Sequence, residues 1–173
     1  MHLAEATTPT LPRASRFGYL MALYGENFDR FERMFLPHRC GLGHWRSSLG
    51  DGLDLHLHVM QQHRYTTEYR LTYDIRDPMT GEPDPSAFLR RYHDARVLEA
   101  THCYVGRRWQ DVLGLHPSPQ TLLGHRLQMN VFLGKWLEFL AEQGHSPHSL
   151  QRDPRPAQRC HETPPESRSI IDA

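Results

Sequence analysis

A dense group of chemically active side chains lies near the middle of the chain. Arg91, Tyr92, His93 and Asp94 are consecutive, and Glu99 follows shortly after them. An arginine fork can hold a carboxylate or a phosphate, histidine exchanges protons near neutral pH, and a carboxylate can orient a histidine. These residue types therefore suit either the binding of an anion or general acid–base chemistry.

Binding is the interpretation that the sequence favours. Arg64 and Tyr65 open another predicted strand, and together with Arg91, Tyr92 and His93 they would form a polar, aromatic surface. Guanidinium groups bind carboxylate and phosphate oxygens through paired N–H donors. We therefore expect a non-catalytic binding or regulatory module whose ligand is an anionic small molecule or a segment of a partner protein.

A hydrolase-type enzyme is the alternative. His93 would act as general base, Asp94 or Glu99 would orient it, and Arg91 would stabilise developing negative charge. Neighbouring residues of a strand point to opposite faces, so His93 and Asp94 reach one site only if the strand bulges or turns between them.

A structural role is the third interpretation of the same residues. Asp94 would accept hydrogen bonds from turn backbone, Tyr92 would pack in the core, and Arg91 would pair with Glu99 across two strands. Such a cross-strand pair contributes only about 0.2–1 kcal/mol. If Arg91 instead belongs to a binding surface, Arg91→Ala should leave thermal stability nearly unchanged.

Alternating apolar and polar residues predict a sheet around these side chains. The alternation is strict over 53–59 and continues over 63–76, with Gln61 and Gln62 placed to turn the chain between the two. The central residues then predict a strand over 87–93, a turn at Asp94 and Ala95, and a strand over 96–104. A period of two is that of half-buried strands. The residues from 38 to 49 contain several glycines and predict a connection without strands.

Apolar residues at spacings of three and four predict two long helices that back this sheet. The first spans 15–36, with Ser15 as its N-cap and Pro37 as its stop, and its charged face is expected to be solvated. The second spans 121–143, with Gly144 as its C-terminal cap. In the second helix, Gln128 and Asn130 are amides in the apolar half and Trp136 belongs to its apolar stripe, so we assign structural roles to all three.

These elements predict a single α+β domain over residues 15–145. About four antiparallel strands are flanked by an N-terminal and a C-terminal amphipathic helix. Residues 1–14 are expected to be a disordered arm, and the proline-rich residues 146–173 a disordered tail.

Composition narrows the class of protein further. Lys plus Arg and Asp plus Glu number 20 each, so the chain lacks the cationic excess of a specific nucleic-acid binder. No run of apolar residues is long enough for a membrane helix, and no cofactor motif occurs, so we expect neither a membrane segment nor a cofactor. We also expect no metal site, because the pair His56 and His58 lacks a third ligand. The odd set of three cysteines and the absence of a signal sequence favour the cytoplasm. The sequence sets no oligomeric state.

The chain also resembles a known family. The resemblance rests on residues in a constant order between about 16 and 145: Phe35-Leu36-Pro37, Arg64-Tyr65-Thr66-Thr67, Arg91-Tyr92-His93-Asp94-Ala95 with Val97 and Glu99, and Gln128, Asn130, Phe132, Leu133, Trp136 and Leu137. In these motifs the chain is similar to the YqiB-like family of bacterial proteins, a domain of unknown function. The resemblance implies a bacterial, cytoplasmic protein and a fold, but no particular activity or catalytic residues.

Overall fold

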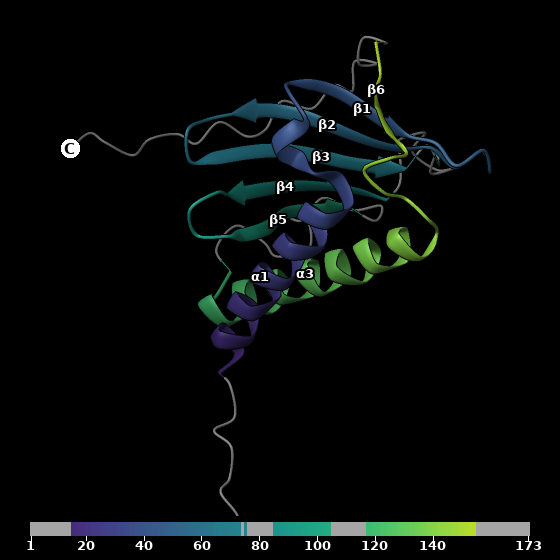
Figure 1. Ribbon diagram of the computed structural model, residues 1–173. Coiled ribbons are helices and arrows are strands. Elements are labelled where there is room, and N and C mark those ends of the chain that lie inside the picture. The colour runs from purple at the N-terminus through teal and green to yellow at the C-terminus, as the bar shows by residue number, and fades with distance from the viewer. Residues whose placement is uncertain (1–14, 74, 76–84, 105–116, 155–173) are drawn as a thin grey trace, which may run out of the picture.

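A six-stranded antiparallel sheet forms the framework of the protein. The computed structural model describes residues 15–73, 75, 85–104 and 117–154. In chain order the elements are α1 (Arg16–Phe35), η1 (Pro37–Arg39), β1 (Gly43–Ser47), β2 (Leu55–Gln62), β3 (Thr66–Tyr73), β4 (Ser86–Tyr92), β5 (Val97–Tyr104), α3 (Pro119–Glu142) and β6 (Leu150–Arg152). The strand order is β5-β4-β3-β2-β1-β6 (Figure 1). The predicted α+β class is therefore confirmed, but the predicted number of about four strands is too low.

The two additional strands, β1 and β6, lie at one edge of the sheet. β1 pairs with β2 and β6 pairs with β1, both antiparallel. β1 occupies the segment that was predicted to be a connection, and β6 lies beyond residue 145, where the disordered tail was expected to begin. The described part of the chain thus continues to residue 154, while the predicted arm over 1–14 and residues 155–173 lie outside the described residues.

Local sequence signals set the ends of α1. Ser15 is its N-cap and accepts a hydrogen bond from the Gly18 N–H at 3.0 Å, as predicted. At the other end, Leu36 takes a left-handed conformation with φ 43°, and its N–H bonds the Glu32 carbonyl. Pro37 follows and cannot continue the helix. The helix therefore stops at the predicted place.

The second helix, α3, is capped in the same way. Ser118 accepts a hydrogen bond from the Thr121 N–H at 3.2 Å, and Pro119 occupies the first turn, where a missing N–H costs nothing. Gly144 follows the helix with φ 100°, a conformation that strains residues with a side chain. The helix begins two residues before the predicted start, because Ser118 supplies the cap and Pro119 the first helical residue.

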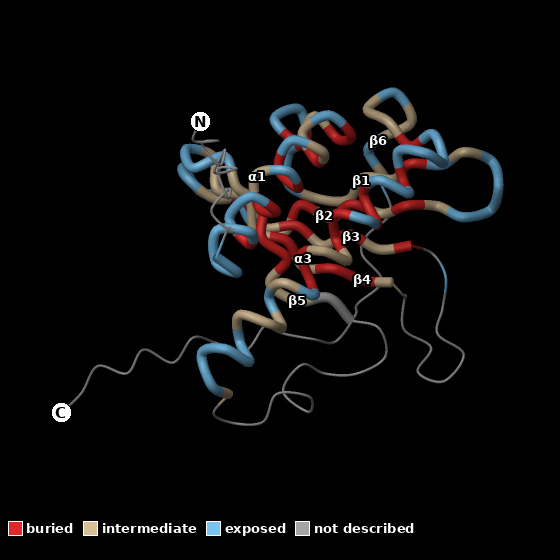
Figure 2. The backbone as a smooth tube through the Cα atoms, turned by 90° about the horizontal axis from the view of Figure 1, so that it is seen from below, coloured by how far each residue is buried: buried red, intermediate tan, exposed pale blue. Residues whose placement is uncertain are grey.

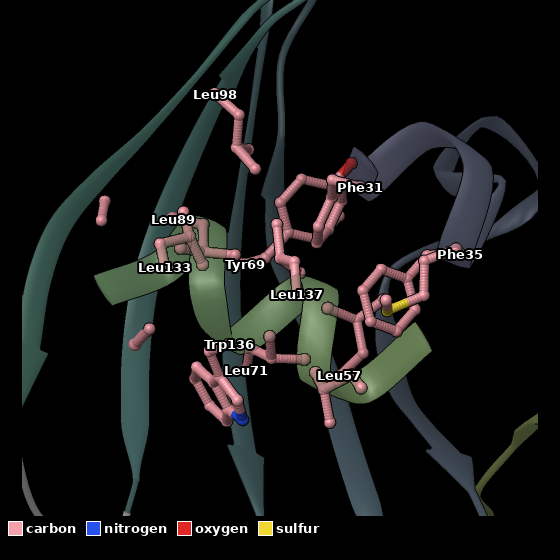
Figure 3. Packing of buried hydrophobic residues seen from close by; sticks show 14 of the residues in the cluster. Phe31, Phe35, Leu57, Tyr69, Leu71, Leu89, Leu98, Leu133, Trp136 and Leu137 are labelled. Carbon is pink, nitrogen blue, oxygen red and sulfur yellow. The ribbon is translucent and has the colours of Figure 1, made fainter. Parts of the chain in front are cut away.

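Both helices contribute to one apolar core against the sheet. The alternating residues Leu55, Leu57 and Val59 of β2 are buried, and the largest buried side chains come from α1, α3 and the strands between them (Figures 2 and 3). Phe31 packs its ring against Tyr69 with centroids 5.1 Å apart. At about 25 cal/mol per Å² of apolar area, this burial is the main stabilising contribution to the fold.

Asn130 joins α3 to the edge of the sheet. β5 is an edge strand, so half of its backbone groups point away from β4. The Ala100 N–H donates to Asn130 Oδ1 at 2.9 Å, and Asn130 Nδ2 donates to the Arg126 carbonyl at 2.8 Å. Asn27 of α1 adds a bond from its Nδ2 to the Asn130 carbonyl at 3.0 Å. This Asn130 bridge fixes α1, α3 and β5 relative to one another.

The other two residues to which structural roles were assigned differ from Asn130. Trp136 is buried in the core, and its Nε1 has no hydrogen-bond partner among the described residues. Gln128 is exposed and makes no hydrogen bond there. Neither α1 nor α3 is apolar enough over a sufficient length to cross a bilayer, and they are the long helices of the described ranges.

Candidate functional site

Two hairpin turns lie together at one end of the sheet. The β2–β3 turn covers residues 63–65 and the β4–β5 turn covers 93–96, and both project from the same side of the sheet (Figure 1). His93 links them. Its N–H bonds the Tyr65 carbonyl at 2.9 Å, its Nδ1 bonds the Arg64 carbonyl at 3.2 Å, and its Nε2 bonds Thr67 Oγ1 at 2.8 Å.

These contacts define the role of the His93 ring. A carbonyl oxygen can only accept, so Nδ1 carries the proton and donates to Arg64. Nε2 shares a hydrogen bond with the Thr67 hydroxyl, which can act as donor or acceptor. Both ring nitrogens are thus engaged within the protein, and His93 serves here to hold the turns together. It has no ring nitrogen open to a substrate proton in this arrangement.

Arg64 and Tyr65 form the exposed part of this end. Tyr65 is 54% exposed, and the Arg64 guanidinium lies over its ring at 5.0 Å from the centroid. Arg64 is also exposed and makes no ion pair with an acidic residue of the described ranges. We call Arg64, Tyr65 and His93 the turn surface.

Arg91 and Tyr92 do not join the turn surface as one group, because they point to opposite faces of β4. Arg91 Nε pairs with Glu32 Oε1 of α1 at 2.5 Å, and its guanidinium lies 5.0 Å from the Phe28 ring centroid. The Arg91 side chain is only 14% exposed. Three of the five predicted binding residues therefore lie together at the turns, whereas Arg91 fastens α1 to the sheet.

Tyr92 instead belongs to a polar cluster around Glu99 at the edge of the sheet. Glu99 is 9% exposed and accepts from Arg126 Nη1 at 2.6 Å, from the Tyr92 hydroxyl at 3.4 Å and from the Tyr24 hydroxyl at 3.5 Å. Burial, and then the Glu99 charge, raise the pKa of Tyr24. The expected Arg91–Glu99 pair is wrong, because Glu99 lies opposite Arg90 in the register.

Asp94 lies in the β4–β5 turn and is exposed. Its Oδ1 accepts a hydrogen bond from the Ala95 N–H at 2.8 Å, which is the turn role that the structural interpretation assigned to it. Asp94 and Glu99 make no hydrogen bond with His93 in the structure. The triad of the enzyme interpretation is therefore not assembled here.

His56 and His58, the histidine pair of β2, lie on the sheet face opposite the helices. His58 stacks on His44 of β1, with ring centroids 3.8 Å apart and an interplanar angle of 17°. Burial, and then the neighbouring His44 and Arg70, lower the pKa of His58 to about 4. Across the residues that the structure places, no group of three or more histidine, cysteine, aspartate or glutamate residues is arranged to hold a metal ion.

A groove between α1 and α3 was not found from the sequence. Its volume is about 510 Å³, and its walls carry Arg30 and Arg33 from α1 and Glu138 and Glu142 from α3. The charged residues of α1 had been assigned to a solvated face. The two walls are more than 100 residues apart in sequence, so only the packing angle of the helices brings them together. The one sequence signal for the groove was the spacing of these charges, which is i, i+3 for the two arginines of α1 and i, i+4 for the two glutamates of α3.

Comparison with known proteins places the chain in a family. Searches of curated proteins and of solved structures give no significant match. A family profile with the description "Protein of unknown function (DUF1249)" matches residues 30–146, more than half of the 173-residue chain. The matched segment contains the whole turn surface and both walls of the groove. The chain therefore belongs to the DUF1249 family.

Proposed function

We propose that this protein is a non-catalytic binding or regulatory module that captures an anionic group at the turn surface. The ligand carries carboxylate or phosphate oxygens, which the Arg64 guanidinium binds. One observation carries the proposal: Arg64 is an exposed arginine stacked on an exposed tyrosine, without an acidic partner among the described residues.

The neighbouring arginines Arg91 and Arg96 differ from Arg64 in their pairing. Arg91 is paired with Glu32, and Arg96 of the second turn pairs with Asp29 at 3.0 Å. Each of these guanidinium groups already has a carboxylate. Arg64 makes no ion pair with an acidic residue in the described part of the chain, so its donors can bind an external anion, and stacking on Tyr65 orients the planar group without using those donors.

Hydrogen bonds from His93 hold the backbone at Arg64 in one conformation, which favours ligand binding. Its carbonyl accepts from His93 Nδ1, and the adjacent Tyr65 carbonyl accepts from the His93 N–H. The backbone of the β2–β3 turn is thus tied to the β4–β5 turn on each side of the Arg64–Tyr65 peptide. A prepositioned turn loses less conformational freedom when a ligand binds.

The test is calorimetric titration of the full chain with four probes. Pyrophosphate represents phosphate ligands, citrate represents carboxylates, adenosine diphosphate adds an aromatic base that can stack on Tyr65, and a polyglutamate peptide represents an acidic protein segment. We expect at least one probe to bind, with an affinity that falls as salt rises. The probe that binds identifies the source of the anionic group.

Matched variants locate the binding. Arg64→Ala should weaken it about 10- to 100-fold, the loss of a charge-assisted hydrogen bond. Arg64→Lys keeps the charge but loses the fork and should be intermediate. Arg152→Ala removes an exposed arginine from β6 at the other edge of the sheet and should bind like the parent. Equal losses in Arg64→Ala and Arg152→Ala, or no binding of any probe, would overturn the proposal.

The resemblance to YqiB-like proteins supports a cellular location for the module. We place the module in the bacterial cytoplasm, where anionic metabolites and acidic proteins are abundant ligands. A cytoplasmic module of this kind needs neither a cofactor nor a metal to hold its ligand.

A further inference from the structure

The groove between α1 and α3 has charges of opposite sign on its two walls. Arg30 and Arg33 project from α1, and Glu138 and Glu142 project from α3, around a space of about 510 Å³. This volume lies in the range of small-molecule sites. On the α1 helix, Asp29 pairs with Arg96 of the β4–β5 turn and Glu32 pairs with Arg91 of β4. The groove lining shares no residue with the turn surface.

The opposed charges of the groove are not paired with each other. Arg30 pairs with Glu26 of its own helix at 3.5 Å. Arg33, Glu138 and Glu142 make no ion pair within the described ranges. The walls therefore present unused guanidinium donors on one side and unused carboxylate acceptors on the other, with room between them.

The base of the groove is apolar and fixed. Met34 and Leu137 lie in the buried core cluster, and both line the groove. His145 closes one end and is held from behind, with Nδ1 bonded to Ser47 Oγ at 2.7 Å and Nε2 to the Tyr73 hydroxyl at 3.4 Å. Above this buried base, the exposed Ala141 also lines the groove and can contact an apolar side chain of a ligand while its charged ends reach the walls.

We propose that this groove binds a small zwitterion of the amino-acid or short-peptide class. The ligand carboxylate meets the arginines of α1, its ammonium meets the glutamates of α3, and an apolar side chain lies against Ala141 and the hydrocarbon stems of the wall residues. A purely anionic ligand would be repelled by the α3 wall, and a purely cationic ligand by the α1 wall. This inference concerns a second surface and stands independently of the turn surface.

The test uses leucyl-leucine as the probe, titrated calorimetrically into the full chain. Two modified peptides each remove one charge: the N-acetyl peptide lacks the ammonium, and the C-terminal amide lacks the carboxylate. We expect leucyl-leucine to bind and each modification to weaken binding about tenfold, the effect of one charge-assisted contact.

Variants of the two walls show which charge meets which wall. Arg33 and Glu142 are exposed, so Arg33→Gln and Glu142→Gln should fold like the parent. Arg33→Gln should weaken leucyl-leucine but not weaken the C-terminal amide further, and Glu142→Gln should show the same relation with the N-acetyl peptide. Arg152→Ala changes no residue of the groove or of the turn surface and should bind leucyl-leucine like the parent.

Three results would overturn the inference. The first is no binding of leucyl-leucine at millimolar concentration. The second is that the wall variants leave its affinity unchanged. The third is that each wall variant weakens all three peptides equally, because the charges would then not meet the walls assigned to them. None of these results bears on the probes of the turn surface, whose binding depends on Arg64.

Discussion

Asn130→Leu removes the side chain that joins α3 to the edge strand of the sheet. Asn130 is fully buried, and its Oδ1 is the acceptor for the Ala100 N–H at 2.9 Å. Leucine has a similar size but cannot accept a hydrogen bond, so a backbone N–H of β5 is left buried without a partner. An unsatisfied buried donor costs about 1–3 kcal/mol. Bonds from Asn130 Nδ2 and from Asn27 connect to the same region, so we expect a loss of about 2 kcal/mol.

The same helix offers a matched control. Gln128→Leu exchanges another amide for leucine two residues earlier, but Gln128 is exposed and makes no hydrogen bond within the described chain. This variant should remain within about 0.5 kcal/mol of the parent. For a chain of this size, a loss of about 2 kcal/mol in Asn130→Leu corresponds to a fall of about 4–8 °C in Tm.

Urea denaturation followed by circular dichroism measures both variants, with Tm from a thermal scan as a second readout. Comparable slopes of unfolding free energy against urea would show that the variants share the compactness of the parent. Unfolding free energies of Asn130→Leu and Gln128→Leu within 0.5 kcal/mol of each other would refute the reasoning, because the buried bond to Ala100 would then contribute nothing.

Three further predictions concern charged and titratable groups. Arg91→Ala should lower the unfolding free energy by about 2–3 kcal/mol in urea denaturation, because Glu32 loses its ion-pair partner and Phe28 becomes more exposed. A change below 0.5 kcal/mol would contradict this structural role and favour a place for Arg91 in a binding surface. Glu99→Gln should cost about 1–2 kcal/mol in the same assay, and combining it with Arg126→Gln should cost less than the sum of the single losses; simple additivity would contradict the pairing. Burial lowers the pKa of His58 to about 4, so its neutral form gives stability above the unfolded pKa near 6.5 that is lost as pH falls toward 4. His58→Gln should therefore flatten the fall in unfolding free energy over that interval, and an unchanged slope would show that His58 does not titrate in this way.

The helices and most of the central strands follow from local signals in the sequence, but the turn predicted at Gln61 and Gln62 is wrong, because β2 continues to Gln62 and the chain turns at 63–65. Ser15 and Pro37 mark the ends of α1, and strict alternation marks β2. β1 lacks such a signal: its residues facing the core are Gly43, Trp45 and Ser47, and only one of them is a large apolar residue. Ser47 is buried because His145 bonds its hydroxyl, a contact across 98 residues that no local pattern predicts.

The candidate site was only partly accessible from the sequence for a similar reason. A period of two places Arg91 and Tyr92 on opposite faces of a strand, so a single surface containing both required a break that β4 does not have. The ties between His93 and the β2–β3 turn depend on hairpin alignment, which turn lengths set. The walls of the groove depend on how α1 and α3 pack, and sequence spacing within either helix carries no information about that angle.

The most direct test of the turn surface is a two-dimensional amide NMR titration of the full chain with pyrophosphate. The account predicts saturable shifts centred on the amides of residues 63–65 and 93–96, and their loss in Arg64→Ala. Shifts centred elsewhere, or equal shifts in Arg64→Ala and the parent, would contradict it.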